Sequence, residues 1–90
     1  MTKIIVHARI NKKHPEISEE NVRVAFDTIL ASATRADREH DEHIAIGCDD
    51  KGRLLELVYT QNEDGDYLIF HAFTPPTKKA MFELGITRRK

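Results

Sequence analysis

The sequence predicts a single α+β domain in which a mainly antiparallel sheet carries helices on one face. Two observations predict it. Short β-rich runs are separated by Asp, Asn, Gly and Pro, and stretches with the apolar spacing of amphipathic helices occur in both halves of the chain. A chain of 90 residues has the size of one domain, so residues 1–90 are expected to fold as one unit. The expected order of elements is β-α-β-β-β-α.

A strand, a helix and a loop are expected in the first half. Residues 4–10 are rich in β-branched side chains and precede a proline, which indicates a strand. Ser18 is a favoured N-cap followed by two glutamates, so a helix is expected to begin at Glu19 and to run to Ser32. Its apolar stripe would consist of Val22, Phe26, Ile29 and Ala33. The polar run 34–42 is expected to be a loop.

Three strands and a short helix are expected in the second half. The predicted strands cover residues 43–48, 53–60 and 67–73. An Asp-Gly pair at residues 64–65 predicts a two-residue hairpin turn between the last two strands. Thr74 and the two prolines after it are expected to start a short helix, which Gly85 ends.

The two-residue turn also assigns the hairpin side chains to two faces. With Val58 opposite His71, Glu56 and His71 become diagonal neighbours within reach of each other. Both would lie on the open face of the sheet. The opposite face is expected to be apolar and covered by helices, with Leu55, Leu57, Tyr59, Leu68, Phe70 and Ala72 on it.

Charge is unevenly distributed along a chain whose net charge is −1. Residues 1–14 and 67–90 are basic, whereas residues 37–66 are acidic. Two basic ends that meet in the fold would form an anion-binding patch, although ordinary variation between segments accounts for the pattern equally well. No apolar run is long enough to span a membrane, and no signal-peptide pattern is present. Because the single Cys48 cannot form an internal disulfide either, we expect a cytoplasmic protein.

Several short motifs resemble those of BrnT-type toxins, which belong to the RelE/ParE superfamily of bacterial toxin–antitoxin pairs. Residues 13–20, Lys-His-Pro-Glu-Ile-Ser-Glu-Glu, are similar to the opening of those toxins. Residues 45–47 and 50–59 are similar to their central hairpin. The His-Ala pair at residues 71–72 stands before the segment in which the family carries an Arg-rich helix. The similar motifs together span roughly residues 7–84.

The resemblance implies a RelE-like fold and an endoribonuclease that needs neither a metal nor another cofactor. In such enzymes the RNA 2′-hydroxyl attacks the adjacent phosphate, which requires a base, an acid and cations. A histidine can fill either proton-transfer role near neutral pH. The implied catalytic residues are Glu56, His71 and Arg53. The implied RNA-binding residues are Lys13, His14, Lys78 and Lys79.

The resemblance also implies a cognate antitoxin as partner, and it leaves open a homo-oligomer or a toxin–antitoxin hetero-oligomer. Residues 73–76 are Phe-Thr-Pro-Pro, where the family usually carries arginines. This departure favours an alternative function, a non-catalytic protein-binding module of the same fold. The candidate residues also have ordinary structural interpretations: Glu56 and Arg53 as solvated side chains, His71 as a partly buried histidine and His14 as a loop residue.

A second group of histidines and carboxylates lies at residues 37–43, Asp-Arg-Glu-His-Asp-Glu-His. Metal sites use these residue types, but H-x-x-H spacing in a loop is weak evidence by itself. We interpret this run as a solvated acidic loop and predict no metal site. Cys48 is interpreted as a small core residue rather than a nucleophile.

Overall fold

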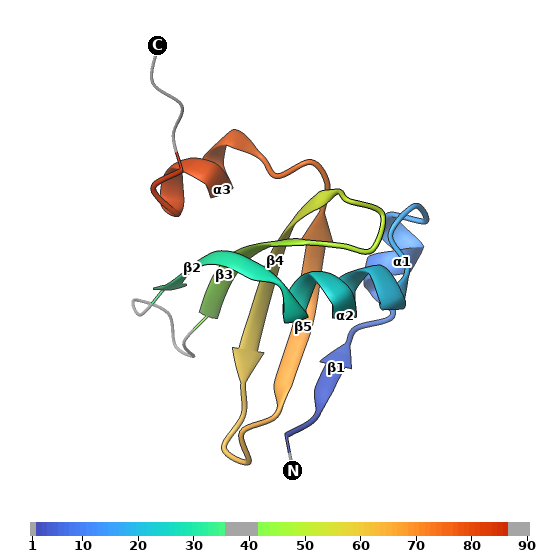
Figure 1. The fold of residues 1–90 in the computed structure, drawn as a ribbon. Helices are drawn as coiled ribbons and strands as arrows, with labels where there is room; N and C mark the ends of the chain where they lie inside the picture. The colour runs from blue at the N-terminus through green and yellow to red at the C-terminus, as the bar shows by residue number, and fades with distance from the viewer. Residues whose placement is uncertain (1, 36–41, 87–90) are drawn as a thin grey trace.

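The computed structural model describes residues 2–35 and 42–86, which form an α+β fold around a five-stranded sheet (Figure 1). The strands are β1 (Ile4–Val6), β2 (Ile29–Arg35), β3 (Glu42–Cys48), β4 (Leu54–Gln61) and β5 (Tyr67–Phe73). The helices are α1 (Arg9–Lys13), α2 (Glu19–Asp27) and α3 (Lys78–Glu83). The sheet order is β1-β5-β4-β3-β2; β1 and β5 are parallel and the other neighbours antiparallel. The predicted fold class is confirmed, with one more strand and one more helix than expected.

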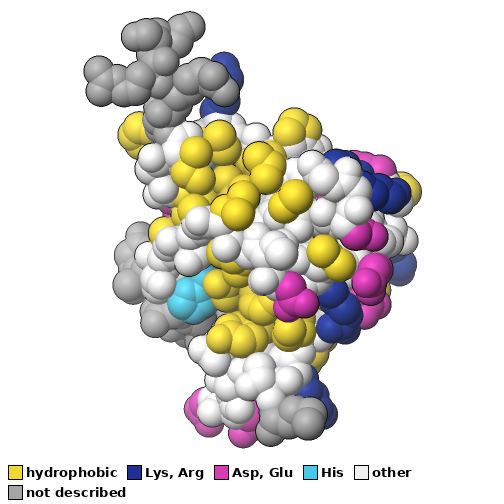
Figure 2. Space-filling view, viewed as in Figure 1, with side chains coloured by type: hydrophobic (Ala, Val, Ile, Leu, Met, Phe, Trp, Pro, Cys, Tyr) yellow, Lys and Arg dark blue, Asp and Glu magenta, His cyan; other side chains and the backbone are white. Residues whose placement is uncertain are grey.

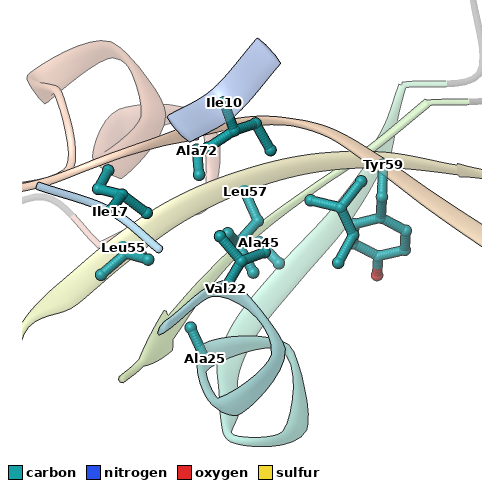
Figure 3. Close-up of a cluster of buried hydrophobic side chains, with 10 residues drawn as sticks. Ile10, Ile17, Val22, Ala25, Ala45, Leu55, Leu57, Tyr59 and Ala72 are labelled. Carbon is teal, nitrogen blue, oxygen red and sulfur yellow. The ribbon is translucent and has the colours of Figure 1, made fainter. Parts of the chain in front are cut away.

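The main hydrophobic core lies between the sheet and the two helices α1 and α2. Figure 3 shows side chains from these helices meeting those of the strands. Leu55 and Leu57 of β4 are completely buried, as are Val22 and Ala25 of α2. Full burial of one such aliphatic side chain contributes about 1.5–3 kcal/mol. The predicted core residues Leu55, Leu57, Tyr59 and Ala72 are all present.

Helix α2 begins where it was predicted to begin. The Ser18 hydroxyl accepts a hydrogen bond from the Asn21 N–H at 3.1 Å, and the Asn21 side chain accepts one from the Ser18 N–H at 2.8 Å. This reciprocal pair satisfies two amides that a helix start leaves without partners. Asn21 itself is buried, so the cap also fixes the helix against the rest of the fold.

The prediction that this helix continues to Ser32 is wrong. The helix ends at Thr28, whose hydroxyl donates to the Val24 carbonyl at 2.8 Å, and the following residues form β2 beside β3. Ile29 and Ala33 are four residues apart, a spacing that suits one face of a helix and equally one face of a strand. The pairing with β3 decides between these two structures, because it gives the inward-facing backbone groups of this edge strand hydrogen-bond partners.

Two other boundaries differ from the predicted ones. The first strand stops at Val6 instead of Ile10, because the chain turns into α1 and buries Ile10 in the main core. The expected loop 34–42 contributes its first residues to β2 and its last to β3. Residues 36–41 lie outside the described part of the chain.

The hairpin between β4 and β5 has a longer loop than the predicted two-residue turn. Gln61 pairs with Tyr67, and the loop between them is organised by Asn62. Its side-chain oxygen accepts hydrogen bonds from the N–H groups of Asp64 and Asp66, at 2.9 and 2.8 Å. This type of local bond is the reason that Asn favours turns.

A β-bulge at Phe70 compensates for the longer loop. Phe70 has no partner in β4, and the register shift restores Val58 opposite His71, as predicted. On the loop side of the bulge, however, the faces are exchanged. Ile69 enters the main core, and Leu68 and Phe70 do not, so the prediction for these two residues is wrong.

Helix α3 packs on the other face of the sheet, so the expectation of helices on one face holds for α1 and α2 alone. Ala80 of α3 forms a small second cluster with Ile44 and Val58. The helix is capped by Thr77 rather than by the predicted Thr74. It ends as predicted at Gly85, which has a φ of 74° and is followed by the return hydrogen bond of a Schellman motif.

Candidate functional site

Glu56 and His71 meet on the face of the sheet opposite the main core, as the sequence predicts. The imidazole Nε2 lies 2.9 Å from the carboxylate Oε2. The Glu56 side chain is 9% exposed, whereas that of His71 is 39% exposed. The carboxylate is therefore shielded behind an imidazole that solvent or a ligand can reach.

The second carboxylate oxygen of Glu56 is held by Thr77. Its Oε1 accepts hydrogen bonds from the Thr77 N–H at 2.7 Å and from the Thr77 hydroxyl at 2.9 Å. The same hydroxyl oxygen accepts the N–H of Ala80 and so caps α3. Sequence reasoning missed Thr77, although a Thr before Lys-Lys-Ala is a recognisable helix cap.

These bonds decide the charge of Glu56. Burial by itself raises the pKa of Glu56, but the hydrogen bonds from Thr77 and His71 outweigh burial and hold it below its ordinary value. At neutral pH the side chain is thus a carboxylate whose two oxygens are both occupied. Such a group can orient His71 and stabilise its protonated form, and it is poorly suited to act as a base itself.

Two adjoining hollows flank His71. The larger has a volume of about 400 Å³, and the polar side chains in its wall include Arg35, Thr77 and Lys79. The smaller has a volume of about 150 Å³ and is lined in part by Lys13 and His14. The residues common to both walls are Arg9, Phe70 and His71. Cations from both basic ends of the chain therefore meet at this site. The charge pattern of the sequence predicted such a patch on the condition that the two ends come together in the fold.

Arg9 is a site residue that sequence reasoning missed, because it was placed in the first predicted strand. Its Nε donates to the Phe70 carbonyl at 3.3 Å, and its guanidinium carbon lies 6.0 Å from the centre of the Phe70 ring. Lys13 and Lys79 are exposed and form no ion pair with any described residue. These cations remain able to bind an anion.

Arg35 also lines the larger hollow. Its Nε and Nη2 donate to the two carboxylate oxygens of Glu83 at 2.6 and 2.9 Å, and its Nη1 donates to Glu42 at 3.2 Å. The pKa of Arg35 is raised above its ordinary value, mainly because of the hydrogen bonds with Glu83. Arg35 thus ties β2 to α3, and its charge is balanced by two carboxylates.

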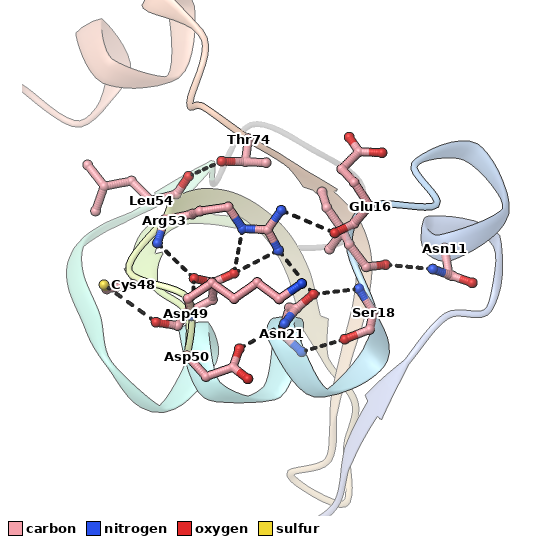
Figure 4. A network of polar contacts seen from close by, with 12 residues as sticks. Asn11, Glu16, Ser18, Asn21, Cys48, Asp49, Asp50, Arg53, Leu54 and Thr74 are labelled. Atoms are coloured by element: carbon pink, nitrogen blue, oxygen red, sulfur yellow. Dashed lines mark hydrogen bonds and ion pairs between the residues drawn. The ribbon is translucent and has the colours of Figure 1, made fainter.

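Arg53, which the resemblance implies to be a catalytic residue, lies apart from the hollows beside His71. It lines neither hollow, and its guanidinium is engaged in a separate polar network (Figure 4). The guanidinium donates to Asp49 Oδ2 at 2.9 Å, to the Glu16 carbonyl at 3.1 Å and to Asn21 Oδ1 at 3.0 Å. Arg53 therefore fixes the start of α2 to the turn between β3 and β4.

Asp49, the ion-pair partner of Arg53, has a side chain with no solvent exposure. Burial tends to raise the pKa of Asp49, but hydrogen bonds from the Arg53 backbone and side chain and from the Lys51 N–H outweigh burial and hold it below its ordinary value. The network has a structural role. Lys78, a predicted RNA-binding residue, also lines neither hollow.

The described residues contain no group of three or more His, Cys, Asp or Glu side chains placed to hold a metal ion. Of the acidic run 37–43, residues 37–41 lie outside the described part of the chain. His43 stacks on Tyr59 with ring centres 5.1 Å apart, and its Nδ1 lies 3.1 Å from the Thr34 hydroxyl. Cys48 is half-buried and is not bonded to another cysteine.

Comparisons with protein-family models, with curated proteins and with solved structures find no match. The resemblance to BrnT-type toxins therefore rests on the sequence motifs. Within the described ranges, no helix is long and apolar enough to cross a membrane.

Proposed function

We propose that this chain is a metal-independent endoribonuclease and the toxin of a toxin–antitoxin pair. The observation that supports this most strongly is the smaller hollow, where two imidazoles, His14 and His71, meet two cations, Arg9 and Lys13. RNA cleavage through the 2′-hydroxyl requires a proton acceptor, a proton donor and positive charge around one phosphate. This hollow brings all three kinds of group together.

His71 is the proton acceptor of the proposed reaction. Because the Glu56 carboxylate can only accept a hydrogen bond, the bonded Nε2 of a neutral His71 carries the hydrogen, and Nδ1 is left to accept a proton. Nδ1 takes the proton of the 2′-hydroxyl as that oxygen attacks phosphorus. Glu56 is a positioning residue that stabilises the imidazolium formed.

His14 is the proton donor. Its Nδ1 lies 4.0 Å from the Glu16 carboxylate, which is within ion-pair distance whenever the ring carries the proton. As the bond between phosphorus and the 5′-oxygen breaks, His14 gives its proton to that oxygen. Arg9 and Lys13 stabilise the charge on the phosphorane. The products are a 2′,3′-cyclic phosphate and a 5′-hydroxyl end.

The proposal includes a cytoplasmic location and a cognate antitoxin that covers the site. A partner is supported by the apolar surface around α3: hydrophobic side chains gather beside this helix in Figure 2, and Phe82 is 75% exposed. A partner segment that also carries acidic residues would match Lys13 and Lys79. Co-expression with the product of the neighbouring reading frame should yield a complex that weakens as salt rises.

The experiment that tests catalysis compares the purified chain with His71→Ala on a defined RNA. The chain should cleave the RNA with EDTA present and leave cyclic phosphate ends, and the variant should be slower by about 10²–10⁴-fold. Replacement of one ribose by deoxyribose should protect the bond after it. Circular dichroism and thermal unfolding establish that the variant is folded.

Two results would contradict the proposal. If the folded wild-type chain cleaves no RNA, the alternative of a non-catalytic protein-binding module replaces it. If His71→Ala cleaves at the wild-type rate, the activity belongs to another site or to a contaminant. Lys78→Ala serves as a matched control, because Lys78 is a cation close in sequence to the site that lines neither hollow.

A further inference from the structure

We infer that the larger hollow is a subsite for one whole nucleotide next to the cleaved bond, with Lys79 binding the phosphate on the far side of that nucleotide. The inference rests on the proposed function for the position of the cleaved bond. It adds that the substrate extends beyond the cleaved bond by one nucleotide and one further phosphate, and that Lys79 binds this phosphate.

The continuity of the two hollows supports a bound strand. Arg9, Phe70 and His71 belong to both walls, so a chain that passes His71 leaves one hollow and enters the other. When the cleaved phosphate lies against His71 and Arg9, the neighbouring nucleotide extends toward Thr77 and Lys79. The strand therefore occupies both hollows in succession.

The larger hollow has the size and lining that a nucleoside requires. Its volume of about 400 Å³ lies within the range of about 300–1,000 Å³ that is usual for small-molecule sites. Its wall includes the buried cluster of Ile44, Val58 and Ala80 and, packed against them, the half-buried Phe70, whose ring is the apolar surface that a base would contact. The Phe70 ring belongs to this wall, and aromatic rings are common platforms for single-stranded bases.

Three described cations line this hollow, and Lys79 is the one that is neither shared with the smaller hollow, as Arg9 is, nor paired with carboxylates, as Arg35 is. The charge of Arg35 is neutralised by its ion pairs with Glu42 and Glu83, so Arg35 is not available to bind a phosphate. Lys79 is exposed and forms no ion pair with a described residue. A ligand that ends at the nucleoside leaves Lys79 unused, whereas one more phosphate engages it.

The test measures binding of an uncleavable dinucleotide in which the first sugar is deoxyribose. Three ligands are compared by titration calorimetry: without a terminal phosphate, with a 5′-phosphate and with a 3′-phosphate. In the wild-type chain and in Lys78→Ala, one of the two phosphates should tighten Kd by about tenfold, the order that one charge-assisted hydrogen bond supplies. In Lys79→Ala this gain should disappear.

The position of the nucleoside is read separately by NMR. Binding should shift the methyl signals of Ile44 and Val58 in the wall of the larger hollow. The inference is overturned if neither phosphate tightens binding, if Lys78→Ala and Lys79→Ala lose the gain equally, or if these methyl signals do not move. If the added phosphate tightens binding through Lys79 but the wild-type chain cleaves no RNA, the proposed reaction is refuted and the subsite stands. Cleavage without such a gain would refute the subsite alone.

Discussion

His71 and Glu56 are joined by a 2.9 Å hydrogen bond although neither is the cross-strand partner of the other. His71 pairs with Val58, and Glu56 pairs with Phe73. Their side chains meet diagonally on one face of the hairpin, which is within the reach of long side chains. The bulge at Phe70 sets this register, so the site depends on a single extra residue in β5.

Thr77 should act through Glu56. Thr77→Ala removes the hydroxyl bond to the carboxylate, and RNA cleavage should fall by about tenfold, whereas Thr77→Ser should retain both the bond and the rate. The alanine variant also loses the cap of α3, which costs about 1 kcal/mol and is measured by urea unfolding. Equal cleavage by the alanine and wild-type chains would show that this bond does not position the site.

The stability of the fold should decrease in acid through Glu56. Its pKa is lower in the folded chain than in the unfolded one, so the unfolded state binds the proton first as pH falls. The stabilisation is complete above the ordinary carboxyl pKa of about 4.3 and is lost as pH falls through the folded value. Urea unfolding between pH 3 and 7, about the range in which a carboxyl titrates, should give a shallower pH dependence for Glu56→Gln than for wild type. The exposed Glu63→Gln should match wild type, and a Glu56→Gln slope equal to wild type would contradict this assignment.

Arg53 should be required for stability rather than for chemistry. Arg53→Ala leaves the buried Asp49 carboxylate without its cation, and the free energy of unfolding should fall by about 3–5 kcal/mol. Arg53→Lys should recover part of this loss, because an ammonium group cannot reach all three partners of the guanidinium at once. Denaturant titration gives both values. A stable Arg53→Ala chain that has lost cleavage would return Arg53 to the catalytic role that the resemblance implies.

Replacement of Gly47 should destabilise the fold for a steric reason. A methyl group at Gly47 would overlap the backbone carbonyl of Ala25, so α2 can approach β3 this closely only at a glycine. Gly47→Ala should lower the free energy of unfolding by about 1–3 kcal/mol, the usual cost of forcing extra atoms into a packed core. Ser32→Ala, at an exposed position of the neighbouring strand β2, is the control and should change stability little. An unchanged melting temperature for Gly47→Ala would show that the helix can shift without cost.

Elements whose signals are local could be predicted from the amino-acid sequence alone. The start of α2 follows from the Ser18 cap, the end of α3 from Gly85, and β3 to β5 from β-rich runs between turn residues. The meeting of Glu56 and His71 was predicted from a turn that is shorter than the observed loop, and it holds because the bulge at Phe70 offsets the difference. The longer loop and the bulge shift the strand register in opposite directions, so their effects on the pairing cancel.

The remaining features could not be predicted locally, because they depend on which distant segments meet in the folded chain. Ile29 and Ala33 suit a helix and a strand equally well, and pairing with β3 settles the choice. Arg53 and Arg9 are both cations near turns, and no local pattern separates them. The fold brings Arg53 to a buried carboxylate and Arg9 to the wall beside His71. A charged side chain takes its role from the partner that the fold places within a few ångströms, since electrostatic energy falls with distance and rises with burial.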